Sequence, residues 1–265
     1  MKQVIHGLLV LTALVSAVAL QAQEPTQTPA AQTPAQAPAD STPTADEIVA
    51  KHIEAIGGKT AIGQVKSLYI ESSTSVMGNE APTVTTVVDG VGYKNETDFN
   101  GTKIVQCYTD KGGWMVNPMA GATDPTPMPD DQYNQGKGQI FVGGPLYDYA
   151  AKGSKVELLG KDGKNYKIKL TTKDNVASTL LIDATTYYLT SIQSKGKMQD
   201  QDVDITMSFS DYRKTDVGFL IPYAIDIDLG QFQLSVAVKK VELNKTIDPA
   251  SFEMPKPAET PKPAA

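Results

Sequence analysis

The sequence predicts a mainly β protein: an antiparallel, incomplete β-barrel covered by an N-terminal helix and by a helical or loop insertion that acts as a lid. Two observations predict this fold. From Ser67 onward, apolar and polar residues alternate with a period of two, as in residues 166–171 and 203–210, which is typical of strands with one apolar and one wet face. Turn signals such as Asp89-Gly90 and Asn100-Gly101 separate these runs, and their spacing indicates a meander of roughly ten to twelve strands.

A helix is expected before the first strand, over residues 45–56. Thr44 and Glu47 have the spacing of a capping box, in which each side chain satisfies a backbone N–H of the first turn. An apolar stripe follows at Ile48, Val49, Ile53 and Ile56, and Gly57-Gly58 ends the helix. This pattern predicts a helix that packs one face on the sheet. Residues 59–64 are expected to form a second short turn.

Residues 118–153 interrupt the alternation with five prolines and several glycines. Short helical segments are expected near Asp130-Asp131 and at residues 146–150. Long structured interruptions of this kind are often lids or binding loops, although a loop without a function fits the same composition.

The two ends of the chain differ from its middle. Lys2, an apolar run over residues 7–19 and the small residues that close it are typical of a secretory signal peptide. We expect this peptide to cover residues 1–22, with cleavage after Ala19 or Ala22, and the protein to be exported. Residues 23–44 and 255–265 carry nine of the 17 prolines, which indicates a disordered linker and tail around a folded domain at residues 45–254.

Composition and motifs argue against several classes of function. The chain is acidic, with a formal net charge of -6, so nucleic acid is not an expected partner. Cys107 is the only cysteine, and His52 is the only histidine after the signal peptide; we interpret His52 as a satisfied residue at the edge of the core. Without a catalytic motif, the chain is expected to be neither an enzyme nor a cofactor-binding protein. The spacing of Asp200, Asp202 and Asp204 is that of a calcium loop, but Ile205 replaces the required glycine. We therefore expect these carboxylates to face solvent and to bind no metal.

A sheet of this size curls, and its interior is either wide enough for an apolar guest or filled by its own side chains. The first reading predicts a ligand-binding cavity, and the second predicts a structural or protein-interaction module of the cell envelope. Trp114 fits both readings, as a cavity residue or as core. The predicted cavity residues are Leu68, Ile70, Val84, Val88, Trp114, Ile205, Met207, Phe209, Ile225 and Ile227, and the predicted lid residues are Val49, Ile53, Ile56, Tyr133, Leu146 and Tyr149.

Several segments in succession carry a resemblance to a known family. Residues 45–58 leading into 65–68, then residues 144–149, 210–223 and 247–252, resemble periplasmic proteins of the outer-membrane lipoprotein-sorting (LolA-like) superfamily. The resemblance covers residues 45–254 in the same order. One feature departs from it: the family's carriers fasten their lid with an arginine on a barrel strand, whereas the single arginine here is Arg213, which matches no such position.

The resemblance implies an incomplete barrel around helices, with an apolar cavity that holds acyl chains. The family's carriers take triacylated lipoproteins from an inner-membrane releasing complex to an outer-membrane receptor. For this chain we therefore expect a periplasmic, chaperone-like carrier or sensor of lipid or lipoprotein acyl chains, with a role in outer-membrane biogenesis. It would be a monomer without a membrane span, and membrane proteins of the envelope would be its further partners.

Overall fold

A computed structural model describes residues 42–76, 78–198, 201–230 and 232–256. The predicted signal peptide, nearly all of the predicted linker and most of the predicted tail lie outside these residues. Within the described residues, no helix is both long enough and apolar enough to cross a membrane.

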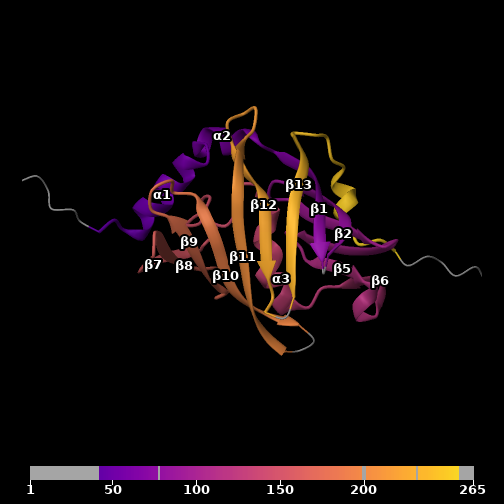
Figure 1. Cartoon of the computed structure of the whole chain (residues 1–265). Helices are drawn as coiled ribbons and strands as arrows, with labels where there is room; N and C mark the ends of the chain where they lie inside the picture. Colours follow the sequence, from indigo (N-terminus) through magenta and orange to yellow (C-terminus); the bar gives the residue numbers. More distant parts are fainter. Residues whose placement is uncertain (1–41, 77, 199–200, 231, 257–265) are drawn as a thin grey trace, which may run out of the picture. The chain divides into compact units, whose positions relative to one another are not determined.

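The described residues form one 13-stranded antiparallel sheet in the order β6-β5-β4-β3-β2-β1-β13-β12-β11-β10-β9-β8-β7. Hydrogen bonds do not close it, because β6 and β7 are its two edges. Two meanders meet where the first and last strands pair (Figure 1). The strands are β1 (Ser67–Val76), β2 (Asn79–Val88), β3 (Gly92–Phe99), β4 (Thr102–Thr109), β5 (Gly113–Asn117), β6 (Ala122–Pro127), β7 (Lys155–Asp162), β8 (Asn165–Thr171), β9 (Ala177–Asp183), β10 (Leu189–Met198), β11 (Gln201–Lys214), β12 (Leu220–Asp228) and β13 (Gln233–Leu243).

The incomplete antiparallel barrel is confirmed, but the sheet has more strands than the roughly ten to twelve expected. One unexpected strand is β6, which lies inside the predicted insertion and contains Pro125 and Pro127. Proline lacks the N–H that an inner strand donates, so an edge strand is where a sheet tolerates it. The proline content of this segment therefore masked a strand.

Two helices precede the sheet: α1 (Ala45–Ala55) and α2 (Gly58–Gln64). The predicted capping box is present, since the Thr44 hydroxyl accepts from the N–H of Glu47, and Glu47 accepts from the N–H of Thr44. The apolar stripe of α1 packs into the main hydrophobic core against Ile168, Leu180 and Ile182 of β8 and β9. We call the face of the sheet that carries α1 the inner face.

The rest of the predicted insertion contains η1 (Pro118–Ala120), α3 (Asp130–Gly136) and η2 (Lys137–Ile140). Gly136 lies so close to Tyr108 of β4 that a Cβ atom would clash with its ring, and α3 also contacts β10. Lys137 of η2 forms an ion pair at 2.6 Å with Asp174, which lies in the turn between β8 and β9. The segment α3–η2 thus reaches both arms of the sheet.

The helix expected at residues 146–150 is absent, and hydrogen-bonded turns take its place. Asp148 has a φ of 46°, and this left-handed conformation does not continue a right-handed helix. This expectation was wrong because the residue pattern indicates helical spacing but does not reveal the left-handed backbone at Asp148.

A separate cluster covers the outer face of β2, β4 and β5. Val105, Cys107 and Trp114 pack there against Phe252 of η3 (Pro249–Phe252), which lies directly on Gly92. Trp114 Nε1 donates to the Phe252 carbonyl at 2.8 Å. Burial raises the pKa of the Cys107 thiol to about 12, so this cysteine is held as a neutral core residue.

Candidate ligand-binding face of the sheet

The strand register divides the predicted cavity residues between the two faces. On β1 and β2, Leu68 is opposite Val87 and Ile70 is opposite Thr85, and these positions lie on the inner face. Val84 is opposite Glu71, and Val88 is opposite Ser67. Since neighbouring strand positions point to opposite faces, Val84 and Val88 lie on the outer face.

Trp114 joins Val84 and Val88 on the outer face, where it packs on Phe252. The expectation that all ten residues share one interior is therefore corrected for these three. Valine occupies both Val87 and Val88, so alternation alone leaves the inward position of this strand ambiguous, and a shift of one residue exchanges the two faces.

The other predicted cavity residues on β11 and β12 do share one face. Met207 is opposite Ile227, and Phe209 is opposite Ile225. The next strand continues both rows, because Ile225 is opposite Val236 and Ile227 is opposite Leu234. We call this set the apolar wall: Ile205, Met207, Phe209, Ile225, Ile227, Leu234 and Val236.

Every residue of the apolar wall is partly exposed. Phe209 alone among them also packs against the main core, so the wall continues the inner face beyond the part that α1 covers. Ile205 packs on Gly196 of β10, where a Cβ atom would clash with its side chain. Leu234 and Val236 were not among the predicted cavity residues, although residues 232–238 alternate in the way that indicates a strand with one apolar face.

Most of the predicted lid residues lie in hydrophobic core. Val49 and Ile53 on α1, Ile56 at its C-terminal cap and Leu146 in the turns after η2 all belong to the main core. Tyr133 on α3 packs in a different cluster, with Tyr108 and Met128 among others. Tyr149 is half-buried and donates a hydrogen bond to Asp46 at the start of α1. A lid movement of these residues stays a prediction.

The β9–β10 turn anchors α1. His52 is 5 % exposed, and its Nδ1 donates to the Tyr187 carbonyl at 2.8 Å; the interpretation of His52 as a satisfied core residue is confirmed. Lys51, the next residue on α1, donates to the Tyr187 hydroxyl at 3.2 Å. Burial lowers the pKa of His52 and outweighs the hydrogen bond to Tyr187, which acts in the opposite direction, so the neutral ring is favoured.

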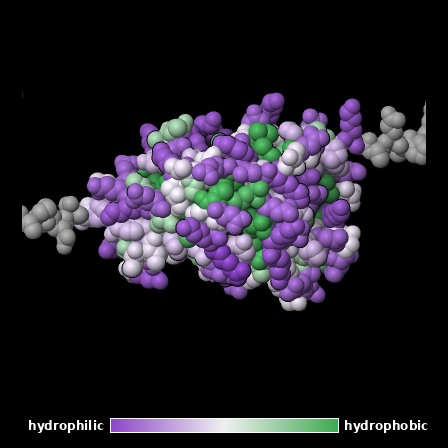
Figure 2. Space-filling model, turned by 90° about the horizontal axis from the view of Figure 1, so that it is seen from above, coloured by the Kyte–Doolittle hydropathy of each residue, from purple (hydrophilic) through white to green (hydrophobic). Residues whose placement is uncertain are grey.

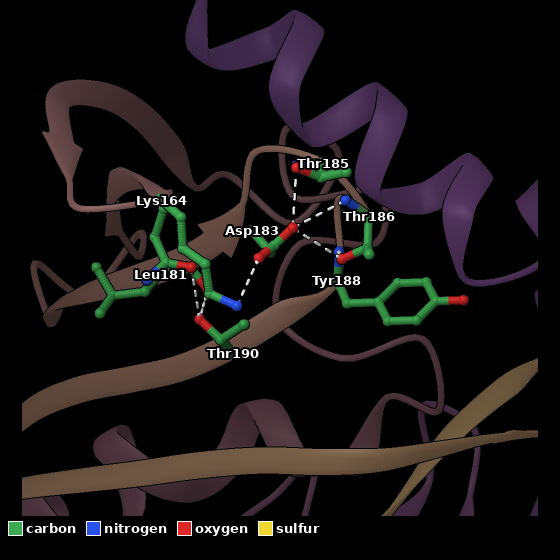
Figure 3. Close-up of polar contacts among 8 residues, drawn as sticks. Lys164, Leu181, Asp183, Thr185, Thr186, Tyr188 and Thr190 are labelled. Carbon is green, nitrogen blue, oxygen red and sulfur yellow. Dashed lines mark hydrogen bonds and ion pairs between the residues drawn. The ribbon is translucent and has the colours of Figure 1, made fainter.

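Asp183 holds this turn in place (Figure 3). Its Oδ1 accepts from the backbone N–H groups of Thr185 and Thr186, at 3.0 and 2.9 Å. Lys164 approaches the other carboxylate oxygen at 3.2 Å. The hydrogen bonds from these two threonines, followed by the Lys164 contact, lower the pKa of Asp183 to about 2. The carboxylate thus positions Tyr187, which has a φ of 57°, against the helix.

Two depressions occur within the described residues. One measures about 410 Å³ and is lined by residues of β8–β11, most of them at outer-face positions such as Gln193 and its cross-strand partners Thr179 and Thr206. The other measures about 450 Å³ and lies between α3 and the loop around Asp174. Both have polar side chains at their margins, and only Ile205 belongs to the predicted cavity set. Seen from above, apolar side chains also reach the surface in the middle of the molecule, between hydrophilic flanks (Figure 2).

The single arginine and the described aspartates with calcium-loop spacing lie on the protein surface. Arg213 pairs with Asp211 at 2.6 Å and lies over the ring of Tyr223. Asp204 pairs with Lys195 on the neighbouring strand. Asp202 is exposed, and Asp200 lies outside the described residues.

The open sheet and the helices on its inner face form an incomplete antiparallel barrel. A LolA superfamily protein from Nitrosomonas europaea superimposes with a TM-score of 0.54 at 12 % identity, over 80 % of this chain and 98 % of that chain. A putative outer membrane lipoprotein-sorting protein domain from Vibrio parahaemolyticus gives 0.48 at 9 % identity, over 78 % and 94 % of the two chains. A DUF1329 family protein from Desulfovibrio piger gives 0.46 at 11 % identity, over 80 % and 98 %.

The likeness to the Nitrosomonas europaea protein confirms the LolA-like fold suggested by the sequence. No family model and no curated protein matches the chain, and the identities are low, so the comparison extends to the fold alone.

Proposed function

We propose that this protein is an exported periplasmic carrier or sensor that binds acyl chains of lipids or lipoproteins against the apolar wall. One observation carries the proposal. The inner face is buried under α1 at Ile168, Leu180 and Ile182, which are 0 % exposed, whereas the apolar wall on the same face is partly exposed. An acyl chain that covered the wall would gain about 0.8 kcal/mol for each buried CH₂.

Binding of this kind needs no chemical step, and we propose that the protein is not an enzyme. The LolA-like fold supports the proposal, because the solved structures with this fold include a LolA superfamily protein. Sorting of lipoproteins to the outer membrane, as a monomer that meets membrane proteins of the envelope, is the specific role that we propose.

The test compares two charge substitutions at adjacent positions of β13. Val236 lies in the apolar wall, whereas the exposed Ala237 points to the outer face, opposite Ala224 and Ser73. Val236→Asp places a carboxylate where the acyl chain would lie, and an unpaired buried charge is costly. We expect it to weaken binding of a fluorescent fatty acid at least tenfold, while the matched control Ala237→Asp binds as the wild type does.

Native mass spectrometry of gently purified protein supplies the second measurement. We expect a co-purifying lipid in the wild type and in Ala237→Asp, and its loss in Val236→Asp. If neither a co-purifying lipid nor fatty-acid binding is found in the wild type, the proposal fails, and an envelope interaction module with a filled interior becomes the better account. Equal losses in both variants would also contradict a site on the inner face.

A further inference from the structure

The inner face carries a row of uncharged polar groups beside the apolar wall. Its members, which we call the polar row, are Thr74 on β1, Thr83 and Thr85 on β2, and Asn95 and Thr97 on β3. Thr83 Oγ1 lies 2.8 Å from Thr74 Oγ1 and 3.0 Å from Thr97 Oγ1. Asn95 Nδ2 donates to Thr85 Oγ1 at 2.8 Å. Except for Thr83, which is 4 % exposed, these residues are partly exposed.

The polar row and the apolar wall meet at the junction of the two meanders. Thr74 is the direct cross-strand partner of Val236, and Val76 is the partner of Leu234. Directly opposed positions on paired antiparallel strands present their side chains on the same face, about 5 Å apart. A molecule lying on the inner face would therefore touch aliphatic side chains on one side and hydroxyl groups on the other.

Charged residues adjoin both sets but point away from them. Glu71, Glu96 and Asp226 alternate with the inward positions of β1, β3 and β12, which places them on the outer face. They have partners there: Lys240 lies 3.8 Å from Glu71, Lys94 lies 3.2 Å from Glu96, and Ser235 donates to Asp226 at 2.6 Å. The polar row and the apolar wall therefore offer no ionised side chain to a ligand headgroup.

This arrangement disfavours both a plain hydrocarbon and an anionic headgroup on the polar row. A hydrocarbon would remove the half-exposed hydroxyls from water without replacing their hydrogen bonds, and a buried anion would lack a positive partner. Each hydroxyl offers one donor and two acceptor sites. Thr74 stands at one end of the hydroxyl chain through Thr83. Thr97 bonds to Thr83 and donates to Asn95 Oδ1 at 3.4 Å, so both threonines keep an acceptor site for a ligand.

We propose that the protein selects an uncharged amphiphile, an acyl ester with free hydroxyl groups, and that the polar row binds its ester and hydroxyl oxygens while the apolar wall binds its chain. This inference rests on the proposed function and adds the class of headgroup to it. The relevant hydrogen bonds are neutral, so the selectivity that they supply is modest for each bond.

The experiment compares 1-oleoylglycerol with oleate, which share one acyl chain and differ in headgroup. Affinities are measured at pH 8, where oleate is ionised, by displacement of a fluorescent apolar probe from delipidated full-length protein. We expect 1-oleoylglycerol to bind at least tenfold more tightly than oleate. The double variant Thr74→Val with Thr97→Val should abolish that preference by weakening 1-oleoylglycerol about tenfold, with oleate binding unchanged or stronger.

Two further variants separate hydrogen bonding from side-chain shape. Thr97→Ser keeps the hydroxyl and should keep the preference. Thr86→Val changes a buried threonine that points to the outer face of the same sheet, since it is opposite Tyr69, and should also keep it. Thermal unfolding of each variant confirms that the fold persists.

The outcomes distinguish the two proposals. If oleate binds as tightly as 1-oleoylglycerol, or if the double variant keeps the preference, the headgroup inference is overturned while acyl binding on the apolar wall stands. If neither lipid displaces the probe, both proposals are overturned.

Discussion

Two halves of the inner face share one sequence pattern and differ in what covers them. On β8 and β9, Ile168 lies between two lysines, while Leu180 and Ile182 flank the partly buried Leu181, and all three inward residues are 0 % exposed under α1. On β12, Ile225 and Ile227 alternate with aspartates in the same way but remain partly exposed. Alternation therefore determines which face a residue occupies, whereas burial requires a second layer above that face.

The difference explains why a ligand is proposed for one half only. The covered half already has its partner, because the stripe on α1 fills it. The uncovered half presents apolar side chains that would lose contact with water when a guest binds. Three predictions follow from this contrast, in order of decreasing effect.

The largest effect should separate the two halves by stability. Ile182→Ala removes a side chain from the filled half and should lower the free energy of unfolding by about 2–5 kcal/mol. Ile225→Ala makes the same chemical change in the apolar wall, where partial exposure and space reduce the loss to below about 1.5 kcal/mol. Urea denaturation of both variants measures the difference. Equal losses would mean that the apolar wall is packed as tightly as the core.

A smaller effect is expected where the turn anchors α1. Asp183→Asn removes the charge from a network of hydrogen bonds and should cost about 1–3 kcal/mol. The folded-state pKa is lowered from 3.8 to about 2, so the contribution of Asp183 is complete above its unfolded pKa and is lost as the pH falls toward 2.

Acid unfolding followed by circular dichroism tests this prediction. The wild-type protein should lose stability more steeply than Asp183→Asn as the pH falls from 5 to 2. Asp202→Asn, which changes an exposed carboxylate on β11, is the matched control and should keep the wild-type slope. If Asp183→Asn also keeps the wild-type slope, Asp183 does not stabilise the turn through its charged carboxylate.

The smallest effect concerns His52 beneath α1. Because burial lowers its folded-state pKa below 6.5, the unfolded chain binds a proton more readily, and stability falls as the pH drops below 6.5. The loss should reach at most about 1.4 kcal/mol for each pH unit. Melting temperatures between pH 7.5 and 5.5 should decline less in His52→Gln than in the wild type. Parallel declines in the two proteins would place the pH response elsewhere.

Much of the fold follows from local pattern. The capping box at Thr44, the stripe on α1 and the alternation of β8, β11 and β12 each identified an element before any contact was known. The misses have physical causes as well. Pro125 and Pro127 in β6 argued against a strand, which tertiary placement at the sheet edge made possible, and the left-handed backbone at Asp148 stopped a helix that local spacing indicated.

The candidate site was only partly predictable. Met207, Phe209, Ile225 and Ile227 were found because each occupies an unambiguous inward position. Val84, Val88 and Trp114 were placed on the wrong face, because their strands carry apolar residues at both parities and the register decides between them. The polar row could not be predicted from the sequence, because threonine is also common on the solvent-exposed faces of strands.

By itself, the sequence determined a helix followed by an antiparallel meander, the positions of many turns and most of the apolar residues that could face inward. These properties depend on neighbours within a few residues, whose periodicity is visible in the chain. Only the tertiary structure decided the pairing of β1 with β13, the face assigned to each side chain and the half of the inner face that α1 covers. They depend on residues far apart in the sequence, such as Thr74 and Val236, whose contact creates the junction between the polar row and the apolar wall.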